Sequence, residues 1–190
     1  VAFGDSKTLG EKNKILKSSS ITMARTLLDT FWFAYKAAER LERYVEVEES
    51  FLILAENKPH ICITAHFGNW EIIGQVCGDR GFPLSSIATP IKNKTANKYF
   101  VQAREATGQK IIPRKGALRK LLGLLRKKGT TAFLADQNTN ETDGGVLVDF
   151  FGLPARVTSA PALLSARTGT DIFIGFGAPQ SGGKYSIYRT

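Results

Sequence analysis

The sequence predicts an α/β fold, with a mostly parallel or mixed central sheet covered by helices. Two observations lead to this prediction. Short apolar runs rich in β-branched residues alternate along the chain with longer segments of helical period, which is the order of βαβ units. Several apolar runs also end directly in polar residues, as happens at the carboxyl edge of a parallel sheet. A chain of 190 residues suffices for one such domain, and we find no linker and no internal repeat.

The first part of the chain is predicted to be mainly helical. A polar helix over residues 8–17 precedes a longer one over 21–43, in which apolar residues recur near helical spacing. Residues 31–35 of the longer helix, Phe-Trp-Phe-Ala-Tyr, are unusually aromatic. They either pack on the sheet as core or dip into a membrane interface, where aromatic side chains are enriched. A short strand over 44–47 and a short helix over 51–57 follow.

The rest of the chain alternates between strands and helices. Strands are predicted at apolar, β-branched runs, over residues 61–65, 84–88, 110–112, 130–135, 146–151, 171–175 and 184–189. Helices are predicted where helical spacing is ended by a loop or a Gly, over residues 70–77, 93–107, 117–127 and 159–167. The segment 137–145 has neither period and is rich in Asn, Thr, Asp and Gly, so it is predicted to be a loop.

The strand over 61–65 leads into the most reactive group of residues in the chain. His66 follows the strand, Gly68 permits a tight turn, and Asn69 is a good N-cap for the next helix. On one continuous helix His66 and Glu71 would lie about 140° apart and could not touch. With a turn between them, the carboxylate can reach the imidazole, which suits a general base. The alternative is a buried structural His beside an ordinary first-turn Glu.

Two other strand ends carry polar residues. Arg114 and Lys115 precede a helix start, so they could bind a phosphate together with free backbone N–H groups. Asp136 follows the apolar run that ends at residue 135. Spacing leaves three roles open for Asp136: binding a metal, orienting Arg114, or capping the loop.

The net charge of +9 and the pI of about 9.7 predict an acidic partner. The segment 114–128 carries basic residues and no acidic one; these are Arg114, Lys115, Arg119, Lys120, Arg126, Lys127 and Lys128. Such a helix is either a solvated face or a docking surface for an anionic lipid or an acidic protein, and the lack of compensating Glu favours docking. A nucleic-acid partner is not expected, because no helix-turn-helix, zinc or ribonucleoprotein signature occurs.

Metal and redox chemistry are not expected. Cys62 and Cys77 lie in apolar surroundings without metal-site spacing, so both are predicted to be buried, reduced thiols. No signal peptide is visible, and no apolar run reaches transmembrane length. The chain opens without Met and closes just inside a strand-like run, so we expect one domain over 1–190 that is a fragment. An N-terminal membrane anchor and a C-terminal part would then lie outside it.

Several of these motifs together resemble a known family. His-Phe-Gly-Asn-Trp-Glu at 66–71 resembles the H-x4-D/E motif of membrane glycerolipid-type acyltransferases. It is most similar to the late acyltransferases of bacterial lipid A assembly, the lauroyl/myristoyl transferase family. The resemblance continues, in order, in residues 112–119, 134–138, 148–152, 154 and 158–164, and it includes 2–4 and 25–29 near the N-terminus.

The resemblance implies transfer of a fatty acyl chain from acyl–acyl carrier protein to a hydroxyl of a lipid A precursor. His66 would be the general base, Glu71 would orient it, and the hydroxyl would attack the thioester without an enzyme nucleophile. The substrate-binding residues would be Arg114, Lys115, Asp136, Asn69 and Gly68, with Arg114 contacting phosphate. No cofactor or metal is required. Phe150 and Phe151 would either line the acyl groove or pack in the core.

The resemblance also implies partners and a location. These are the acyl carrier protein, the lipid A precursor and the anionic inner-membrane surface, at the cytoplasmic face of the inner membrane. Two alternatives remain. One keeps the chemistry but uses a glycerolipid or another glycolipid, such as an acylated mannoside, as acceptor. The other is a non-catalytic module that binds an anionic membrane surface or a carrier protein.

Overall fold

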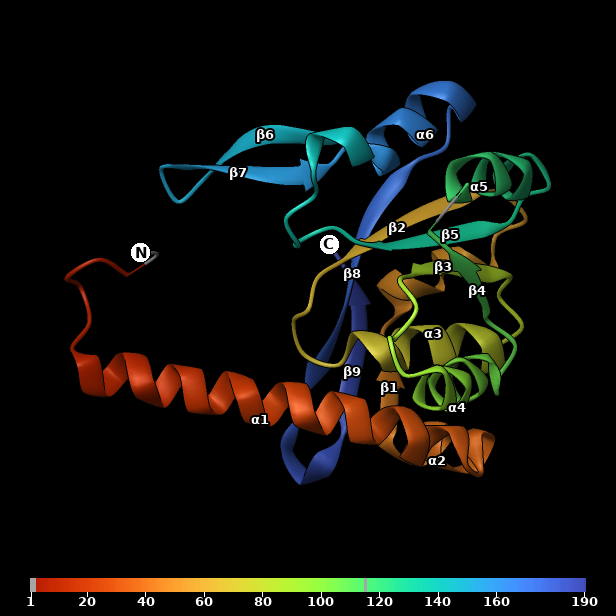
Figure 1. Cartoon of the computed structure of the whole chain (residues 1–190). Helices are drawn as coiled ribbons and strands as arrows, with labels where there is room; N and C mark the ends of the chain where they lie inside the picture. The colour runs from red at the N-terminus through yellow and green to blue at the C-terminus, as the bar shows by residue number, and fades with distance from the viewer. Residues whose placement is uncertain (1–2, 115) are drawn as a thin grey trace.

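The computed structural model describes residues 3–114 and 116–190. Its main feature is a seven-stranded sheet in the order β1-β9-β8-β2-β5-β3-β4 (Figure 1). The strands are β1 (Val45–Val47), β2 (His60–Thr64), β3 (Leu84–Ala88), β4 (Lys110–Pro113), β5 (Thr130–Leu134), β8 (Ile172–Pro179) and β9 (Tyr185–Arg189). Every neighbouring pair in this sheet is parallel except β8 with β9. The predicted α/β class with a mostly parallel sheet is confirmed.

Helices cover both faces of the sheet (Figure 1). One face carries α1 (Leu9–Ala34), α2 (Ala37–Tyr44), α3 (Trp70–Asp79) and α4 (Lys94–Glu105). The other face carries α5 (Ala117–Arg126) and α6 (Ala160–Thr168). Each layer has its own apolar core, one that includes Phe33, Phe51 and Ile72 and another that includes Leu121 and Leu164. Because β2 lies between the two layers, four of its five residues are buried, as expected for a central parallel strand.

The start of the chain differs from the prediction of two helices separated near residue 20. Residues 9–34 form one helix, which begins with a capping box in which Thr8 and Glu11 bond to each other's backbone N–H. The polar residues near position 20 do not break it, because Ser20 Oγ donates to the Leu16 carbonyl at 2.9 Å. The helical region is interrupted instead at Lys36, whose φ of 51° is left-handed, and α2 follows.

The aromatic segment 31–35 is divided between the core and the surface, because Phe33 is buried whereas Phe31 and Trp32 are 40% and 39% exposed. Phe33 is buried in the core, and the Phe31 ring meets Phe100 edge-on at 4.7 Å. Trp32 meets Tyr44 edge-on at 5.2 Å, and Tyr35 stays exposed. Phe33 thus packs as core, while the exposed rings of Phe31, Trp32 and Tyr35 leave the membrane-interface alternative open for their side of the helix. Among the helices of residues 3–114 and 116–190, none has the length and apolar character needed to cross a bilayer.

The strand predicted over 146–151 does not join the main sheet. It is β6 (Gly145–Phe150), and it pairs antiparallel with β7 (Leu153–Thr158) to form a separate hairpin (Figure 1). Strand β7 was not predicted from the sequence: Leu153, Ala155 and Val157 alternate along it, but Pro154 is unusual within a strand. The remaining elements are 3-10 turns: η1 (Glu49–Ala55), where a short helix was predicted, η2 (Glu141–Asp143) and η3 (Ser181–Gly183).

Candidate active site

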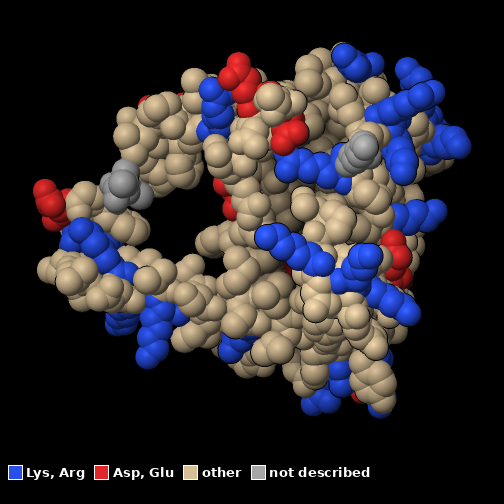
Figure 2. Space-filling view, in the orientation of Figure 1, with Lys and Arg blue, Asp and Glu red and all other residues tan. Residues whose placement is uncertain are grey.

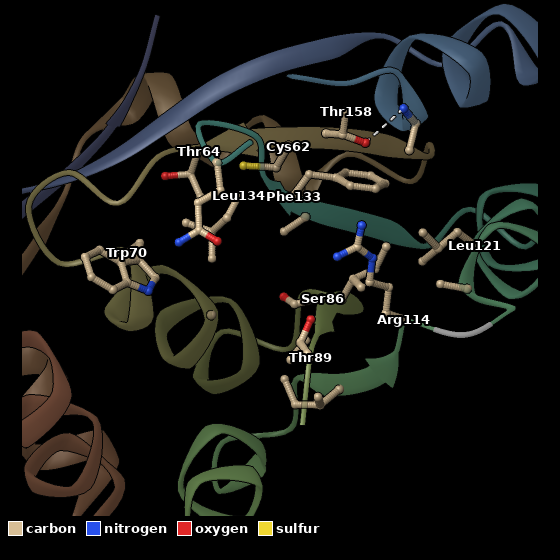
Figure 3. Close-up of a pocket in the computed structure, with 18 of the residues that line it drawn as sticks. Cys62, Thr64, Trp70, Ser86, Thr89, Arg114, Leu121, Phe133, Leu134 and Thr158 are labelled. Carbon is tan, nitrogen blue, oxygen red and sulfur yellow. Dashed lines mark hydrogen bonds between the residues drawn. The ribbon is translucent and has the colours of Figure 1, made fainter. Parts of the chain in front are cut away.

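The carboxyl ends of β2, β4 and β5 meet around one cavity of about 530 Å³ (Figure 3). His66 follows β2, Arg114 follows β4, and Gln137 follows β5; all three side chains line the cavity. The prediction that these strand ends share one edge of the sheet is therefore confirmed. Parallel strands bring together residues that lie up to 71 positions apart in the sequence.

His66 is held by Asp136, which lies just beyond the end of β5. The ring nitrogen Nδ1 lies 2.9 Å from Asp136 Oδ1, and the backbone N–H of His66 donates to Asp136 Oδ2 at 2.9 Å. One carboxylate thus fixes both the backbone and the ring of the same residue. The sequence left three roles open for Asp136. Its carboxylate neither orients Arg114 nor caps the loop, because it bonds to His66 instead.

The contact with Asp136 determines which ring nitrogen of His66 is free for chemistry. A carboxylate accepts hydrogen bonds, so Nδ1 carries the proton and Nε2 keeps its lone pair. The Gln137 amide nitrogen lies 3.4 Å from Nε2, where it can donate a weak hydrogen bond. A substrate hydroxyl that replaces this weak contact would present its proton to Nε2. The arrangement meets the geometric requirement for a general base.

Glu71 does not orient His66, which corrects the prediction from spacing. Its carboxylate accepts from Arg104 Nε at 2.8 Å and from Arg104 Nη2 at 2.5 Å, and it also accepts from Trp70 Nε1 at 3.2 Å. The helix start places Glu71 as predicted, in the first turn of α3, but the side chain turns toward α4. The guanidinium provides a bidentate partner that the imidazole cannot match. Nothing in the sequence pointed to Arg104.

Trp70 links the hydrogen-bonded pair of His66 and Asp136 to the ion pair of Glu71 and Arg104. Its ring meets the His66 ring edge-on at 4.7 Å, and its Nε1–H donates to Glu71. Glu71 and Arg104 also line the cavity, so they form part of its wall even though they do not bond to the imidazole. The H-x4-E spacing therefore serves two neighbouring pairs, His66 with Asp136 and Glu71 with Arg104.

The turn between β2 and α3 is built as the sequence predicted. Gly68 has φ +61°, and a Cβ at this position would lie 2.2 Å from the carbonyl oxygen of Gly177. Asn69 caps α3 by accepting from the Ile72 N–H at 3.2 Å. Asn69 is buried, and its amide donates to Asp29 at 3.2 Å, so both ends of its side chain have protein partners. The structure gives Gly68 and Asn69 roles in shaping the turn, and substrate contact by them stays a prediction.

Helix α1 ties down this turn from outside. Thr26 Oγ1 donates to the Gly68 carbonyl at 3.1 Å, and the Asp29 carboxylate accepts from Asn69 and from the Tyr185 hydroxyl at 2.5 Å. Burial raises the pKa of Asp29, although the bonds from Tyr185 and Asn69 oppose that shift. Burial and the neighbouring Asp29 carboxylate raise the pKa of Tyr185 to about 12. Sequence reasoning missed this network, because it joins residues more than 150 positions apart.

Arg114 occupies the opposite side of the cavity from Trp70 (Figure 3). Its Nη2 lies 3.0 Å from Asp143 Oδ2, in a half-exposed ion pair. Such a pair contributes little to stability, about 0–1 kcal/mol, so an anionic ligand can compete for the guanidinium at small cost. Lys115, predicted to bind substrate beside Arg114, lies outside the described residues.

The cavity continues through a gap in the central sheet. Strands β3 and β5 pair only as far as Ser86 and Ala132. Beyond that point β3 stays with β4 to residue 88, and β5 stays with β2 to residue 134. The cavity passes between the separated strands, so residues of both helical layers line it, among them Ile73 of α3 and Leu121 of α5. The part of the cavity lined by His66, Arg114 and Gln137 is its polar mouth, and apolar side chains such as Leu121 and Phe133 line much of the rest (Figure 3).

Neither metal binding nor thiol chemistry is indicated in this cavity. Within residues 3–114 and 116–190, no group of three or more His, Cys, Asp or Glu side chains is placed to hold a metal ion. Cys62 and Cys77 are buried free thiols, as predicted, and burial raises the pKa of Cys62 to about 12. A thiol with so high a pKa stays protonated at neutral pH and is a poor nucleophile.

Comparison with known proteins agrees with this site. The profile of the family described as bacterial lipid A biosynthesis acyltransferase matches residues 1–187. A phosphatidylinositol mannoside acyltransferase of Mycobacterium tuberculosis (strain ATCC 25618 / H37Rv) is 29% identical over 139 residues, which is 70% of this chain and 43% of the relative. The enzyme of the same name from Mycolicibacterium smegmatis (strain ATCC 700084 / mc(2)155) is 26% identical over 133 residues, covering 68% and 43%. The chain thus spans less than half the length of these relatives.

The α/β sheet, the His–carboxylate pair at its edge and these similarities place the chain among acyltransferase families. More particularly, the chain belongs to the bacterial lipid A biosynthesis acyltransferase family, because the family profile covers nearly all of it. The resemblance seen in the sequence motifs is therefore confirmed.

Proposed function

We propose that this protein transfers a fatty acyl chain from acyl–acyl carrier protein to a hydroxyl of a lipid A precursor. The observation that carries the proposal is the His66 ring, held by Asp136 through Nδ1, with Nε2 at the mouth of an apolar cavity. A base next to an apolar pocket suits a reaction between a hydroxyl and a fatty acyl thioester. Membership of the family supports the same chemistry.

In the proposed reaction, His66 Nε2 takes the proton of the acceptor hydroxyl as its oxygen attacks the thioester carbonyl. A new C–O bond forms and a tetrahedral intermediate follows. The C–S bond then breaks, and the departing thiolate takes the proton back from the imidazolium. Asp136 stabilises the imidazolium by its negative charge, which is the usual role of the carboxylate in such a pair. The ester and the free thiol of the carrier are the products, and no enzyme nucleophile is needed.

The gap between β3 and β5 supplies a place for the acyl chain. Its walls beyond the polar mouth are mainly aliphatic, as in the side chains of Ile87, Leu118 and Leu121. Arg114 lies at the same mouth with only an exposed ion pair to hold it, so it is available for a phosphate on the acceptor. Lipid A precursors carry such phosphates, and this is the specific reason to prefer them over neutral acceptors.

The proposed partners are the acyl carrier protein and an anionic membrane surface, at the cytoplasmic face of the inner membrane. The supporting feature is the outer face of α5 and the turn after it, where five exposed cations gather: Arg119, Lys120, Arg126, Lys127 and Lys128. Figure 2 shows Lys and Arg side chains concentrated over this part of the molecule. The buried side of α5 is apolar, so the cations face outward and are free to meet an acidic surface.

A second acceptor class also has support. The relatives at 26–29% identity are named phosphatidylinositol mannoside acyltransferases, so a glycolipid other than a lipid A precursor is the alternative acceptor. The same base and the same acyl pocket would serve it. A phosphatidylinositol mannoside also carries a phosphate, so Arg114 could contact either acceptor and does not separate the two.

The test uses the full-length protein, labelled acyl–acyl carrier protein and the two acceptors in separate reactions. We expect transfer to the lipid A precursor, and loss of at least a thousandfold in the His66→Ala variant, because the base is removed. Transfer to the mannoside alone would support the alternative acceptor. Equal, measurable turnover by the wild-type protein and the His66→Ala variant would contradict the assignment of His66 as the base. No turnover by the wild-type protein with either acceptor would support a binding module.

A further inference from the structure

The β6–β7 hairpin has a feature that the proposed reaction does not use. It stands apart from the central sheet and projects on the same side as the N-terminal half of α1 (Figure 1). Phe150 and Phe151, predicted to line the acyl groove or to pack in the core, lie at its tip and are 62% and 70% exposed. The tip residues do not line the active-site cavity. Both parts of that prediction are therefore wrong.

The two faces of the hairpin differ in composition. Its register pairs Val146 with Val157, Val148 with Ala155 and Phe150 with Leu153. Side chains of directly paired residues share a face, and alternate residues along a strand lie on the same side. One face is therefore made of six apolar residues without a polar one, and none of the six is buried.

The opposite face is mixed, because it also carries Leu147 and Pro154, and it is tied to the body of the protein. It carries Asp149 and Arg156, and the Arg156 guanidinium pairs with Glu141 at 3.1 Å. At the base of the hairpin, the Ser159 hydroxyl donates to the Gly144 carbonyl at 2.7 Å. The hairpin is thus fixed at its base and on its mixed face, while its apolar face has no partner among the described residues.

The tip holds its aromatic rings outward. Phe151 has φ +56°, a left-handed conformation that is costly for a bulky side chain. Its ring meets that of Phe150 edge-on at 4.7 Å, so the two form one exposed aromatic cluster. Gly152 completes the turn. Positive φ at Phe151 and Gly152 is what a two-residue hairpin turn requires, but Asn or Gly usually fills the first of these positions, so the turn does not account for the choice of an exposed Phe there.

The size of the apolar face indicates what covers it. A hairpin of two strands, each six residues long, measures roughly 20 Å by 10 Å. One of its faces therefore covers about 200 Å² in projection. Stable protein–protein interfaces bury about 800 Å² of accessible surface per partner, so this face alone falls short of a stable interface with a second copy of the chain or another protein. A bilayer has no such minimum area, because its hydrocarbon accepts each apolar side chain separately.

We propose that the apolar face and aromatic tip of the β6–β7 hairpin insert into the hydrocarbon layer of a lipid bilayer. The base of the hairpin, at Gly144, Thr158 and Ser159, lines the active-site cavity, so insertion would place the cavity mouth at the membrane surface. This inference deepens the proposed function, because it names how a lipid acceptor would reach His66. The expected membrane contact through exposed cations is thus joined by a second contact, through a specific apolar element of the protein.

The test is tryptophan fluorescence of the full-length Phe151→Trp variant, with the wild-type emission of Trp32 and Trp70 subtracted. The probe is vesicles of phosphatidylethanolamine and phosphatidylglycerol, with and without doxyl-labelled lipid. We expect a blue shift and quenching of the introduced indole by the doxyl lipid, unchanged at 0.5 M NaCl because the contact is apolar. If the protein co-sediments with the vesicles but the introduced indole still emits at the wavelength of a water-exposed tryptophan, the inference is overturned. A blue shift that follows protein concentration without vesicles would overturn it in favour of a second copy.

A paired activity measurement separates this inference from the proposed function. In the Phe150→Ser/Phe151→Ser variant we expect transfer to a vesicle-embedded acceptor to fall at least tenfold, with transfer to a detergent-dispersed acceptor unchanged. Tyr99→Ser, which removes an exposed aromatic from α4, is the matched control and should change neither rate. An equal fall in the rate of transfer to the vesicle-embedded and the detergent-dispersed acceptor would contradict the inference. If the wild-type protein transfers to no acceptor, the proposed function fails, and the quenching result still decides insertion.

Discussion

Replacing Asp136 by Asn tests the assignment of the His66 partner most directly. The Asp136 carboxylate accepts from both Nδ1 and the backbone N–H of His66, each at 2.9 Å. An amide of the same shape keeps one of these bonds at most, because its NH2 group faces a donor at the other position. The substitution also removes the negative charge that stabilises the imidazolium during proton transfer.

The size of the effect follows from the geometry. For unit charges about 4 Å apart at an effective dielectric constant of about 20, the attraction is about 4 kcal/mol. Partial exposure of both side chains reduces this to roughly 3 kcal/mol, which corresponds to a fall of about a hundredfold or more in kcat. Because the contact acts in the transition state rather than in substrate binding, KM should change little.

The assay is acyl transfer at saturating acyl–acyl carrier protein, combined with ¹⁵N NMR of the two His66 ring nitrogens. We expect the wild-type protein to show the tautomer with the proton on Nδ1, and the Asp136→Asn variant to show a mixture. Glu71→Gln is the matched control, since it also neutralises a carboxylate at the same cavity but leaves the His66 contact intact. A kcat within threefold of wild type for Asp136→Asn, together with a larger loss for Glu71→Gln, would refute the reasoning and restore Glu71 as the partner.

Three further predictions follow from the same structure. Glu71→Gln leaves the Arg104 guanidinium without its carboxylate, so urea unfolding should show a loss of about 2–3 kcal/mol, largely recovered when Arg104→Gln is added. Gly68→Ala, whose methyl would meet a backbone oxygen, should lower the melting temperature and activity far more than Gly81→Ala, which has similar φ but open space. The raised pKa of Tyr185, about 12 against an ordinary 10, gives stability that is complete below pH 10 and lost as pH rises toward 12. Tyr185→Phe should remove about 2–3 kcal/mol of that alkaline dependence in unfolding titrations, and an unchanged pH profile would contradict the assigned hydrogen bond.

The error at Glu71 shows how far local spacing can lead. The sequence correctly predicted the strand, the turn at Gly68, the cap at Asn69 and the helix start at Trp70. Each of these depends on residues within a few positions, where backbone geometry is set by local chemistry. The direction in which the Glu71 side chain points depends instead on α4, which supplies Arg104 from 33 positions away. No local pattern contains that information.

The difference between local and distant information also explains the outcomes for Asp136 and for the contacts of helix α1. Asp136 was identified as a strand-end residue from the sequence, but its partner was left open among three roles. The parallel pairing of β2 with β5 decided the matter, since it brings the ends of these strands side by side. The tie from α1 through Asp29 to Asn69 and Tyr185 was not foreseen, because three distant segments meet there.

By itself, the sequence determined the α/β class, most strand positions, the turn that presents His66 and the family. Periodicity and turn chemistry are local properties, and ordered motifs identify a family without coordinates. Only the tertiary structure decided which carboxylate holds the imidazole, that β3 and β5 part to admit a cavity, and that the Phe150–Phe151 pair lies on an exposed hairpin. Each of these depends on strand order and register, which are set by packing between segments that the chain keeps far apart.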